Sequence, residues 1–456
     1  MFLIGVFAAR CLRGTEVALV DWSKIPDVGA VALLTTAFAS LARHGRSPFS
    51  AIWLTGWLMI VLHFAAFMFL PVPGWIGPAA SFFGLSALAW AGILFMWAAV
   101  PYRTQLSSRL MLLALFASNT FYIALSTIVP ARHELLAFAA ILFGVLPLGV
   151  AFGNLRSFTH PLRWTLVVLN SALSVFLLAV QNRPGNGPDL ALNGILFTVY
   201  FGCGVHFWYA YRRATSGALI TIVGFFAWAN VFTIAPLMGA FLPNFHLESE
   251  VWNLPKYVVA VGMILLLLED QIEHNKYLAL HDELTGLPNR RLFQDRLASA
   301  LERARRTGSK AALLLVDLDH FKQVNDTVGH HIGDELLKRV SQLFIGRVRR
   351  SDTVARTGGD EFAVILEEPV NRAHALRVSR SLSELLDSPF DLEGHTVQVG
   401  ASVGIAVFPE DASDAESLCI AADRRMYAGK HASRRITAGP RLPHPLPHHP
   451  LPATET

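Results

Sequence analysis

Acidic side chains stand at two turn-like places in the last third of the sequence. Asp317 directly follows the apolar run Ala311–Val316, which is typical of a buried central strand. Asp360 and Glu361 follow a Gly-Gly pair between two short expected strands, which is a hairpin signal. If the two acid-bearing strands are neighbours in a sheet, these three carboxylates converge on one point.

Carboxylates clustered without His or Cys favour Mg²⁺ over zinc, and Mg²⁺ is usually bound by one or two carboxylates plus substrate phosphates. Gly358 and Gly359 would let a nucleotide approach the backbone closely. Lys322, about one helical turn beyond Asp317, would neutralise phosphate charge. Each feature is weak alone, because a Gly-Gly pair is usually only a turn and Asp-x-Asp is commonly surface charge.

Alternating elements are expected to position these residues. Helices are predicted over residues 291–306, 333–347, 370–386 and 415–430, and strands over 311–316, 353–356, 361–366 and within 396–408. Because hairpins interrupt the alternation, the pattern indicates an α+β fold rather than a strictly parallel wound sheet.

The 456-residue chain is 53% hydrophobic and only 16% charged, and it divides into two populations. Up to Leu268 it has 14 Lys and Arg against 7 Asp and Glu, whereas the remainder has 24 against 27. The basic excess therefore belongs to the apolar half, which argues against a nucleic-acid partner. The three cysteines are far apart and show no metal-binding spacing.

The apolar half contains runs long enough to cross a membrane, which takes about 20 mostly apolar residues. Eight or nine spans are expected, at Val28–Ala42 (the weakest), Phe49–Leu70, Gly77–Val100, Leu110–Val129, Leu135–Phe152, Trp164–Val180, Leu190–Tyr211, Gly217–Leu242 and Trp252–Leu268.

Charges in the connecting loops predict the orientation. Arginine pairs occur in alternate loops, at Arg43/Arg46, Arg103/Arg109, Arg156/Arg163 and Arg212/Arg213. The positive-inside rule places these loops, and everything after Leu268, in the cytoplasm. The side of the N-terminus depends on whether eight or nine spans exist.

Polar residues say little about what the apolar half does. Asp, Glu, Lys and Arg are missing from the middle of every confident span, which argues against an ion-coupled transporter. His63 and His206 are expected to make hydrogen-bonded helix contacts rather than share a metal. Interhelical hydrogen bonds are expected from Asn119, Asn170, Asn193 and Asn230.

The last span continues without Gly or Pro into residues 269–280, which predicts a helix leading out of the bilayer. Its apolar spacing suits a short coiled coil or equally a solvated helical linker. The expected organisation is an N-terminal segment (1–27), a multi-span domain (28–268), a helical linker (269–280), a cytoplasmic domain (281–438) and a Pro/His-rich disordered tail (439–456).

The expected hairpin carries the sequence Gly358-Gly359-Asp360-Glu361-Phe362. This is the signature that names the family of GGDEF-domain diguanylate cyclases, which the cytoplasmic half resembles over roughly residues 281–435. Three further segments match its motifs in order and at family spacing: Asp282–Arg290 (DxLTGLxNR), Asp317–Asp326 (DxDxFKxxND) and Gly329–Asp334 (GHxxGD).

The resemblance implies a fold and a reaction. The fold would be an antiparallel sheet with flanking helices, like the palm of nucleotide cyclases and polymerases, behind an all-α transmembrane bundle of 8–9 helices. Two GTP molecules would condense into cyclic di-GMP with release of two pyrophosphates. Each domain holds one GTP, so the active form would be a homodimer.

The resemblance also assigns roles by position. Asp317, Asp360 and the Leu318 carbonyl would hold Mg²⁺ (or Mn²⁺), and Asp360 or Glu361 would help deprotonate the attacking 3′-hydroxyl. The remaining implied contacts are to guanine from Asn325 and Asp334, and to phosphate from the backbone near His320 and Phe321 and from Lys322, Lys430 and Arg434. Near Lys430 the family's Gly-Arg-Asn is replaced by Ser433-Arg434-Arg435, which makes the contacts of Arg434 less secure.

Arg349 and Asp352 match the family's RxxD inhibitory site, which would bind cyclic di-GMP as product and inhibitor. The alternative is a surface salt bridge at the start of a strand. Taken together, we expect a multi-pass diguanylate cyclase of a bacterial cytoplasmic (inner) membrane. The alternatives are a non-catalytic membrane receptor for GTP or cyclic di-GMP, and a transporter with a regulatory cytoplasmic domain.

Overall fold

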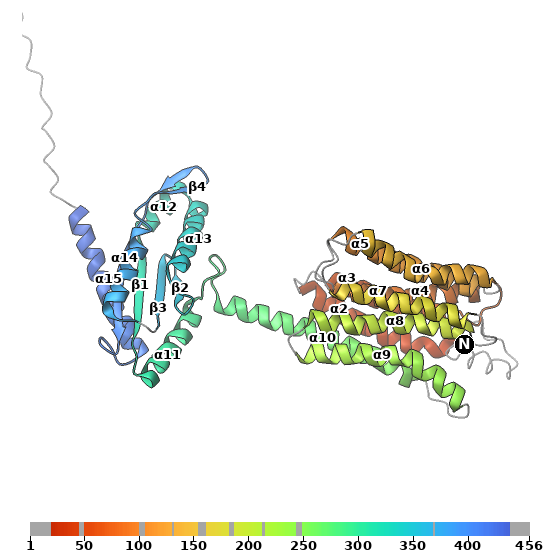
Figure 1. The fold of residues 1–456 in the computed structure, drawn as a ribbon. Coiled ribbons are helices and arrows are strands. Elements are labelled where there is room, and N and C mark those ends of the chain that lie inside the picture. Colours follow the sequence, from red (N-terminus) through yellow and green to blue (C-terminus); the bar gives the residue numbers. More distant parts are fainter. Residues whose placement is uncertain are drawn as a thin grey trace, which may run out of the picture. The chain divides into compact units, whose positions relative to one another are not determined.

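The computed structural model describes residues 20–44, 50–99, 105–129, 132–153, 161–181, 187–211, 215–242, 249–367 and 370–437. The chain divides into two compact units, residues 1–273 and 274–456, which are described separately below. Figure 1 labels the elements of both units.

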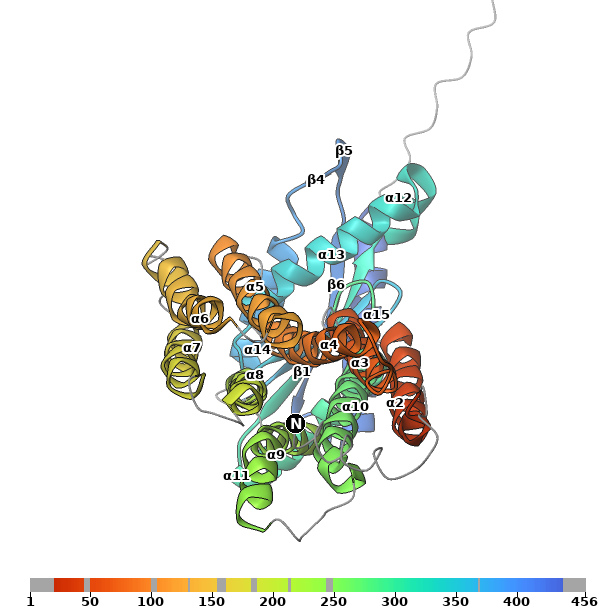
Figure 2. The same ribbon diagram turned by 90° about the vertical axis from the view of Figure 1, so that its right-hand side faces the viewer.

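Apolar helices make up the first unit. After a short 3₁₀ helix (Trp22–Lys24), nine α-helices lie within the described ranges: α2 (Ile25–His44), α3 (Ser50–Phe67), α4 (Ile76–Ala98), α5 (Leu106–Ile128), α6 (His133–Gly153), α7 (Pro161–Val180), α8 (Gly187–Ala210), α9 (Ser216–Phe241) and α10 (Ser249–Leu280). Figure 2 shows this bundle nearly end-on. Eight of the helices are long and apolar enough to cross a membrane, and the ninth, α7, offers the shorter apolar stretch Trp164–Val180.

The expected spans correspond to these nine helices. Most of the arginine-bearing loops lie outside the described residues, so the orientation of the bundle stays a prediction. Residues 1–19 and the Pro/His-rich tail also lie outside the described residues, so the expectations for them stay predictions.

The hydrogen bonds made by polar side chains of the bundle differ in part from those expected. His63 and His206 make the expected helix contacts, with Nδ1 lying 2.9 Å from Gly84 O and 2.8 Å from Gly202 O, respectively. The expectation that asparagine side chains donate hydrogen bonds between helices was wrong. The Nδ2 group of each asparagine donates instead to the backbone carbonyl four residues earlier in its own helix, which holds for Asn119, Asn170, Asn193 and Asn230. Bonds between helices come instead from Tyr200 Oη to Leu88 O and from Trp90 Nε1 to Thr120 Oγ1, both 2.9 Å.

Charged residues that the sequence reading did not single out are buried near the starts of α2 and α10. Asn253 Nδ2 donates to Asp27 Oδ1 over 2.8 Å, and Lys256 Nζ donates to Asn253 Oδ1 over 2.5 Å. All three side chains belong to residues less than 8% exposed. Asp27 is the third residue of α2 and Lys256 the eighth residue of the 32-residue α10, so both charges lie closer to the starts of these helices than to their middles.

Helix α10 is one continuous 32-residue helix, as the uninterrupted sequence after Leu268 predicted. Small residues bring it close to α9, since a Cβ at Gly217 would lie 2.7 Å from Leu266 N. Glu269 Oε1 of α10 also accepts a hydrogen bond from Gly217 N, at the start of α9, over 3.1 Å. The two helices are thus joined where the linker begins.

The second unit is built on a four-stranded antiparallel sheet with strand order β2-β3-β1-β6. Figure 1 labels β1, β2 and β3 of this sheet. The strands are β1 (Ala311–Asp319), β2 (Thr353–Gly358), β3 (Glu361–Leu366) and β6 (Gly400–Phe408), and a separate small sheet pairs β4 (Phe390–Leu392) with β5 (His395–Val397). The helices are α11 (Arg290–Thr307), α12 (Phe321–Val328), α13 (His330–Arg347), α14 (Arg372–Glu384) and α15 (Ala415–Thr437). This confirms the α+β expectation.

Alternation along the strands divides the core into two layers. Residues such as Leu314 and Val316 of β1 pack with α13 and α14, whereas Leu313 packs with α11 and α15 on the opposite face. Asp317 lies two and four residues after Leu315 and Leu313, so it belongs to the face covered by α11 and α15.

Candidate active site

Strand pairing brings the candidate acids together. In the β1–β3 ladder Asp317 is directly opposite Glu361, and Leu318 N donates to Asp360 O over 3.2 Å. The expected convergence of the two carboxylate-bearing turns is therefore observed. One detail differs, because β1 continues two residues past Asp317, and Asp319 there accepts a 2.8 Å hydrogen bond from Ser402 Oγ of β6.

The hairpin between β2 and β3 is held by an arginine that the sequence reading did not single out. Arg356 donates from Nε and Nη2 to Gly359 O, over 2.9 and 2.8 Å. Its Nη1 donates to Asp282 Oδ1 over 2.9 Å. Gly359 has φ of +34°, a conformation that favours glycine. The Asp282–Arg290 segment thus supports the tip that carries Asp360.

An open groove of about 400 Å³ lies beside this tip. Its lining combines the hairpin with the start of α11: Asp282, Asn289, Arg290, Arg291, Arg356, Thr357, Gly358 and Gly359. Asn289 caps α11 by accepting from the backbone N of Arg291 and Leu292. The glycine pair therefore has open, arginine-lined space on this side.

The electrostatics of the acids favour a cation. Burial, reinforced by the neighbouring Asp317 carboxylate, raises the pKa of Asp360. Partial burial, together with Asp317 and Asp360, raises the pKa of Glu361. Asp317 already has one cationic partner, because Lys430 Nζ of α15 donates to its Oδ1 over 2.5 Å. A further positive charge near Asp360 and Glu361 would relieve the repulsion that raises these pKa values.

Among the described residues at this point, the candidate ligands are oxygen donors. The described residues contain no preassembled group of three metal-ligating side chains. A divalent cation would thus take two carboxylates and complete its shell from backbone and phosphate oxygens, as Mg²⁺ commonly does.

A second part of the site lies after β1. His320, with φ of +63°, turns the chain into α12, a short helix that the sequence reading did not predict. Asn325 on this helix has a buried Oδ1 with no hydrogen-bond partner among the described residues. A Cβ at Gly333 of α13 would clash with that oxygen, so any larger residue there would displace the Asn325 side chain. Asp334, the next residue, is exposed on α13.

Known proteins resemble this unit. Residues 279–435 match the family described as diguanylate cyclase, GGDEF domain. Residues 279–435 are a GGDEF domain. Two of the similar proteins come from Pseudomonas aeruginosa. The bifunctional diguanylate cyclase/cyclic di-GMP phosphodiesterase MucR is 39% identical over 39% of this chain and 28% of its own length, and the diguanylate cyclase TpbB is 40% identical over 37% of this chain and 39% of its own length. The chain thus spans well under half the length of these relatives.

A solved structure that comprises only the GGDEF domain of TpbB is also similar. It is 41% identical, with a TM-score of 0.33, and the match covers 33% of this chain and 89% of that chain.

The structure describes the side chains of some, but not all, of the remaining candidate site residues in the GGDEF domain. Phe321 and Phe362 are buried, and Lys322 is exposed on α12. Arg434 belongs to α15, but the side chains beyond Lys430 lie outside the described residues.

The RxxD segment of the GGDEF domain forms a turn before β2. Asp352 accepts from the backbone N of Arg349 over 2.9 Å and from the backbone N of Glu367 over 3.1 Å. Its carboxylate is therefore engaged with backbone rather than with the Arg349 guanidinium, which differs from a simple surface salt bridge. The side chain of Arg349 is exposed beside this turn.

Proposed function

We propose that this protein is a membrane-bound diguanylate cyclase that condenses two GTP into cyclic di-GMP and two pyrophosphates. The observation that carries the proposal is the pairing of β1 with β3 in a GGDEF domain, which sets Asp317 opposite Glu361 and next to the hairpin residue Asp360. The relatives named above as diguanylate cyclases support the same reaction class.

Asp317 and Asp360, with the Leu318 carbonyl, are the residues that would hold Mg²⁺ or Mn²⁺. Their oxygen-only chemistry and the raised pKa of Asp360 fit a hard divalent cation. When bound, such a cation neutralises phosphate charge and stabilises the attacking and leaving oxygens.

Glu361 is suited to accept the proton of the attacking 3′-hydroxyl. Its raised pKa brings its proton affinity closer to what a general base needs near neutral pH. The ribose 3′-oxygen then forms a bond to the α-phosphorus of the facing GTP, and the bond from that phosphorus to the β-phosphate oxygen breaks. Pyrophosphate leaves with the bonding electrons, and the second half-reaction closes the ring in the same way.

Positive and polar groups around the acids would hold the nucleotide. Lys322 and Lys430 would contact phosphates, as would the backbone amides near His320 and Phe321. Asn325, whose buried Oδ1 lacks a described partner, and Asp334 would contact the guanine edge and select GTP over ATP. An unpaired buried acceptor is costly, so a base amino group that donates to it would gain affinity.

Catalysis would need two protomers, because one domain offers one set of acids and one guanine site. The apolar helices would anchor the protein in a bacterial cytoplasmic membrane, with the GGDEF domain on the cytoplasmic side. Arg349 and Asp352 would bind cyclic di-GMP and limit its accumulation.

The test uses the full-length protein in lipid nanodiscs with GTP and Mg²⁺, and mass spectrometry to detect cyclic di-GMP. We expect product from GTP, none from ATP and none from Asp360→Asn. A protein that binds Mg²⁺ and GTP but yields no cyclic di-GMP at any protein density would refute catalysis and favour the receptor alternative.

A further inference from the structure

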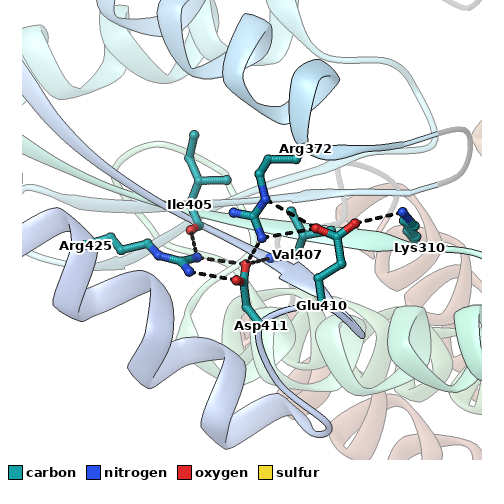
Figure 3. Close-up of polar contacts among 7 residues, drawn as sticks. All are labelled: Lys310, Arg372, Ile405, Val407, Glu410, Asp411 and Arg425. Carbon is teal, nitrogen blue, oxygen red and sulfur yellow. Dashed lines mark hydrogen bonds and ion pairs between the residues drawn. The ribbon is translucent and has the colours of Figure 1, made fainter.

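A cluster of charges lies at the far end of β6 from the acids of the active site. Its centre is Asp411, just after the strand, and it receives Arg372 from α14 and Arg425 from α15 (Figure 3). Because β6 is the edge strand and these two helices cover opposite faces of the sheet, one carboxylate ties both layers together at this edge.

The bond to Arg425 is the strongest part of the cluster. Arg425 donates from Nη2 to Asp411 Oδ1 over 2.7 Å and from Nη1 to Oδ2 over 2.8 Å, a bidentate pair. Nη1 also donates to Ile405 O over 2.6 Å. Asp411 accepts further from Arg372 Nη2 and from Val407 N, both over 2.7 Å, and only 10% of its side chain is exposed. Hydrogen bonds from Arg425 hold the pKa of Asp411 well below its usual range.

The same turn of α15 lies directly on β6. A Cβ at Gly404 would approach Ala422 O and Met426 N, the latter at 2.5 Å, so only glycine allows this contact. Leu418 and Ala422 bury their side chains in the core, but beyond Ala422 the described residues of α15 are exposed except for the half-buried Met426 and Lys430. Arg425 is therefore the last ionic anchor of the helix before Lys430.

Lys430 follows Arg425 by five residues, which is about 7.5 Å along a helix. It is the residue that reaches back to Asp317 of β1. A helix end with little apolar burial frays readily unless something fixes it. The direction in which Lys430 points thus depends on how firmly the preceding turn is held.

We propose that Asp411 is a positioning residue for nucleotide binding: by clamping Arg425 it fixes α15 so that Lys430 lies at Asp317, where the metal-bound triphosphate of GTP would sit. This inference rests on the proposed function for the identity of the ligand. It assigns a role in the site to two residues, Asp411 and Arg425, that are remote from the acids.

Three variants of the full-length protein in nanodiscs test the clamp. Arg425→Met removes it, Arg425→Lys keeps the charge but not the bidentate geometry, and Asp411→Asn removes the charge on the other side. The matched control is Glu410→Gln, which alters contacts to Arg372 and Lys310 but touches no residue of α15. The measured quantities are the Kd of a non-reactive α,β-methylene GTP analogue in the presence of Mg²⁺, and the KM and kcat for GTP.

We expect Arg425→Met and Asp411→Asn to weaken Kd and raise KM roughly fivefold to tenfold, with Arg425→Lys in between and Glu410→Gln within about twofold. Repeating Arg425→Met in a Lys430→Met background decides the mechanism. If the clamp acts through Lys430, the second substitution adds less than about twofold. Equal losses in both backgrounds, or unchanged affinity in Arg425→Lys and Arg425→Met, would overturn the proposal.

The two hypotheses fail in different ways. Wild-type protein that binds the analogue but makes no cyclic di-GMP refutes the cyclase proposal, and the binding cycle still tests the clamp. Wild-type protein that makes cyclic di-GMP, with an Arg425→Met effect that is independent of Lys430, refutes the clamp alone. Hydrogen exchange of the β1 amides shows whether a variant has lost its fold, in which case the milder Arg425→Lys variant supplies the answer.

Discussion

Lys430, in the last helix of the GGDEF domain, donates a 2.5 Å hydrogen bond to Asp317, 113 residues earlier on the central strand. The side chains are 28% and 12% exposed, respectively, so the pair is partly shielded from water. A charge-assisted bond of this kind engages one carboxylate oxygen of Asp317 and leaves the second oxygen available to a metal ion. The strand acid and the helix lysine thus act as one unit at the proposed triphosphate site.

Replacing Asp317 with asparagine keeps the shape of the side chain but removes its charge and leaves Lys430 without its partner. We expect cyclic di-GMP formation to fall by about 100-fold or more, the usual scale for losing one preorganised electrostatic group. The matched control is Asp319→Asn, because Asp319 lies in the same motif but accepts from Ser402 at the edge strand. Initial rates with Mg²⁺ and GTP make the comparison, and equal losses in both variants would contradict the assignment of Asp317 as the ligand.

The parts of this site that local sequence patterns encode could be predicted, whereas contacts between residues far apart in the sequence could not. The pairing of β1 with β3 was foreseeable, because an apolar run and a hairpin signal each ended in acids. The extension of β1 to Asp319 was not, since two of its last three residues are aspartates. Helix α12 has only eight residues and two buried side chains, too little for a periodic signal. The role of Arg356 depends on Asp282, 74 residues away, and no local pattern encodes such a contact. The same limit hid the Asp411–Arg425 clamp.

The raised pKa of Asp360 predicts how the metal-free domain responds to pH. An acid whose pKa is raised in the folded state prefers its protonated form there, so its charge costs stability as pH rises through the folded pKa. Asp360→Asn removes this cost, and we expect slower hydrogen exchange of β1 and β3 amides than in the wild type at pH 7. The difference should vanish below the ordinary carboxyl range, near pH 3. Adding Mg²⁺ should reverse the order, because only the wild type gains a ligand. Faster exchange in metal-free Asp360→Asn at pH 7 would refute the argument.

Gly333 gives a test of the guanine site that leaves the acids intact. A methyl group at this position meets Asn325 Oδ1 at 1.9 Å, so Gly333→Ala must displace Asn325. We expect the KM for GTP to rise about tenfold and the preference for GTP over ATP to fall by a similar factor, because a positioned hydrogen bond is lost. Gly346→Ala is the matched control on the same helix, since a Cβ there meets nothing within 4 Å. Retained GTP preference in Gly333→Ala would argue against a role for Asn325 in base recognition.

The two residues of the RxxD site should behave differently on substitution. The side chain of Arg349 is exposed, whereas the Asp352 carboxylate accepts two backbone hydrogen bonds. Arg349→Ala should therefore relieve product inhibition, seen as continued cyclic di-GMP accumulation in progress curves, with stability unchanged. Asp352→Ala should relieve inhibition but also cost about 1–2 kcal/mol, because two backbone donors lose their partner. Progress curves of Arg349→Ala that level off at the wild-type product concentration would show that the site does not inhibit.

In the apolar unit, the buried chain of hydrogen bonds from Lys256 through Asn253 to Asp27 joins the helix that leads to the GGDEF domain with the first apolar helix. Asp27→Ala leaves the Lys256 charge buried without a compensating acid, which typically costs about 3–5 kcal/mol. We expect a lower melting temperature. Tryptophan fluorescence is the probe of melting, because all 10 tryptophans precede Asn253.

The double variant Asp27→Ala/Lys256→Met should recover most of the lost stability, since it removes the unpaired charge and leaves an apolar side chain of similar length. Asp21→Ala, which removes an acid that accepts hydrogen bonds from the exposed Ser23, should cost no more than about 1 kcal/mol. If Asp27→Ala and Asp21→Ala melt alike, or if Lys256→Met fails to rescue, the buried pair does not hold these two helices together.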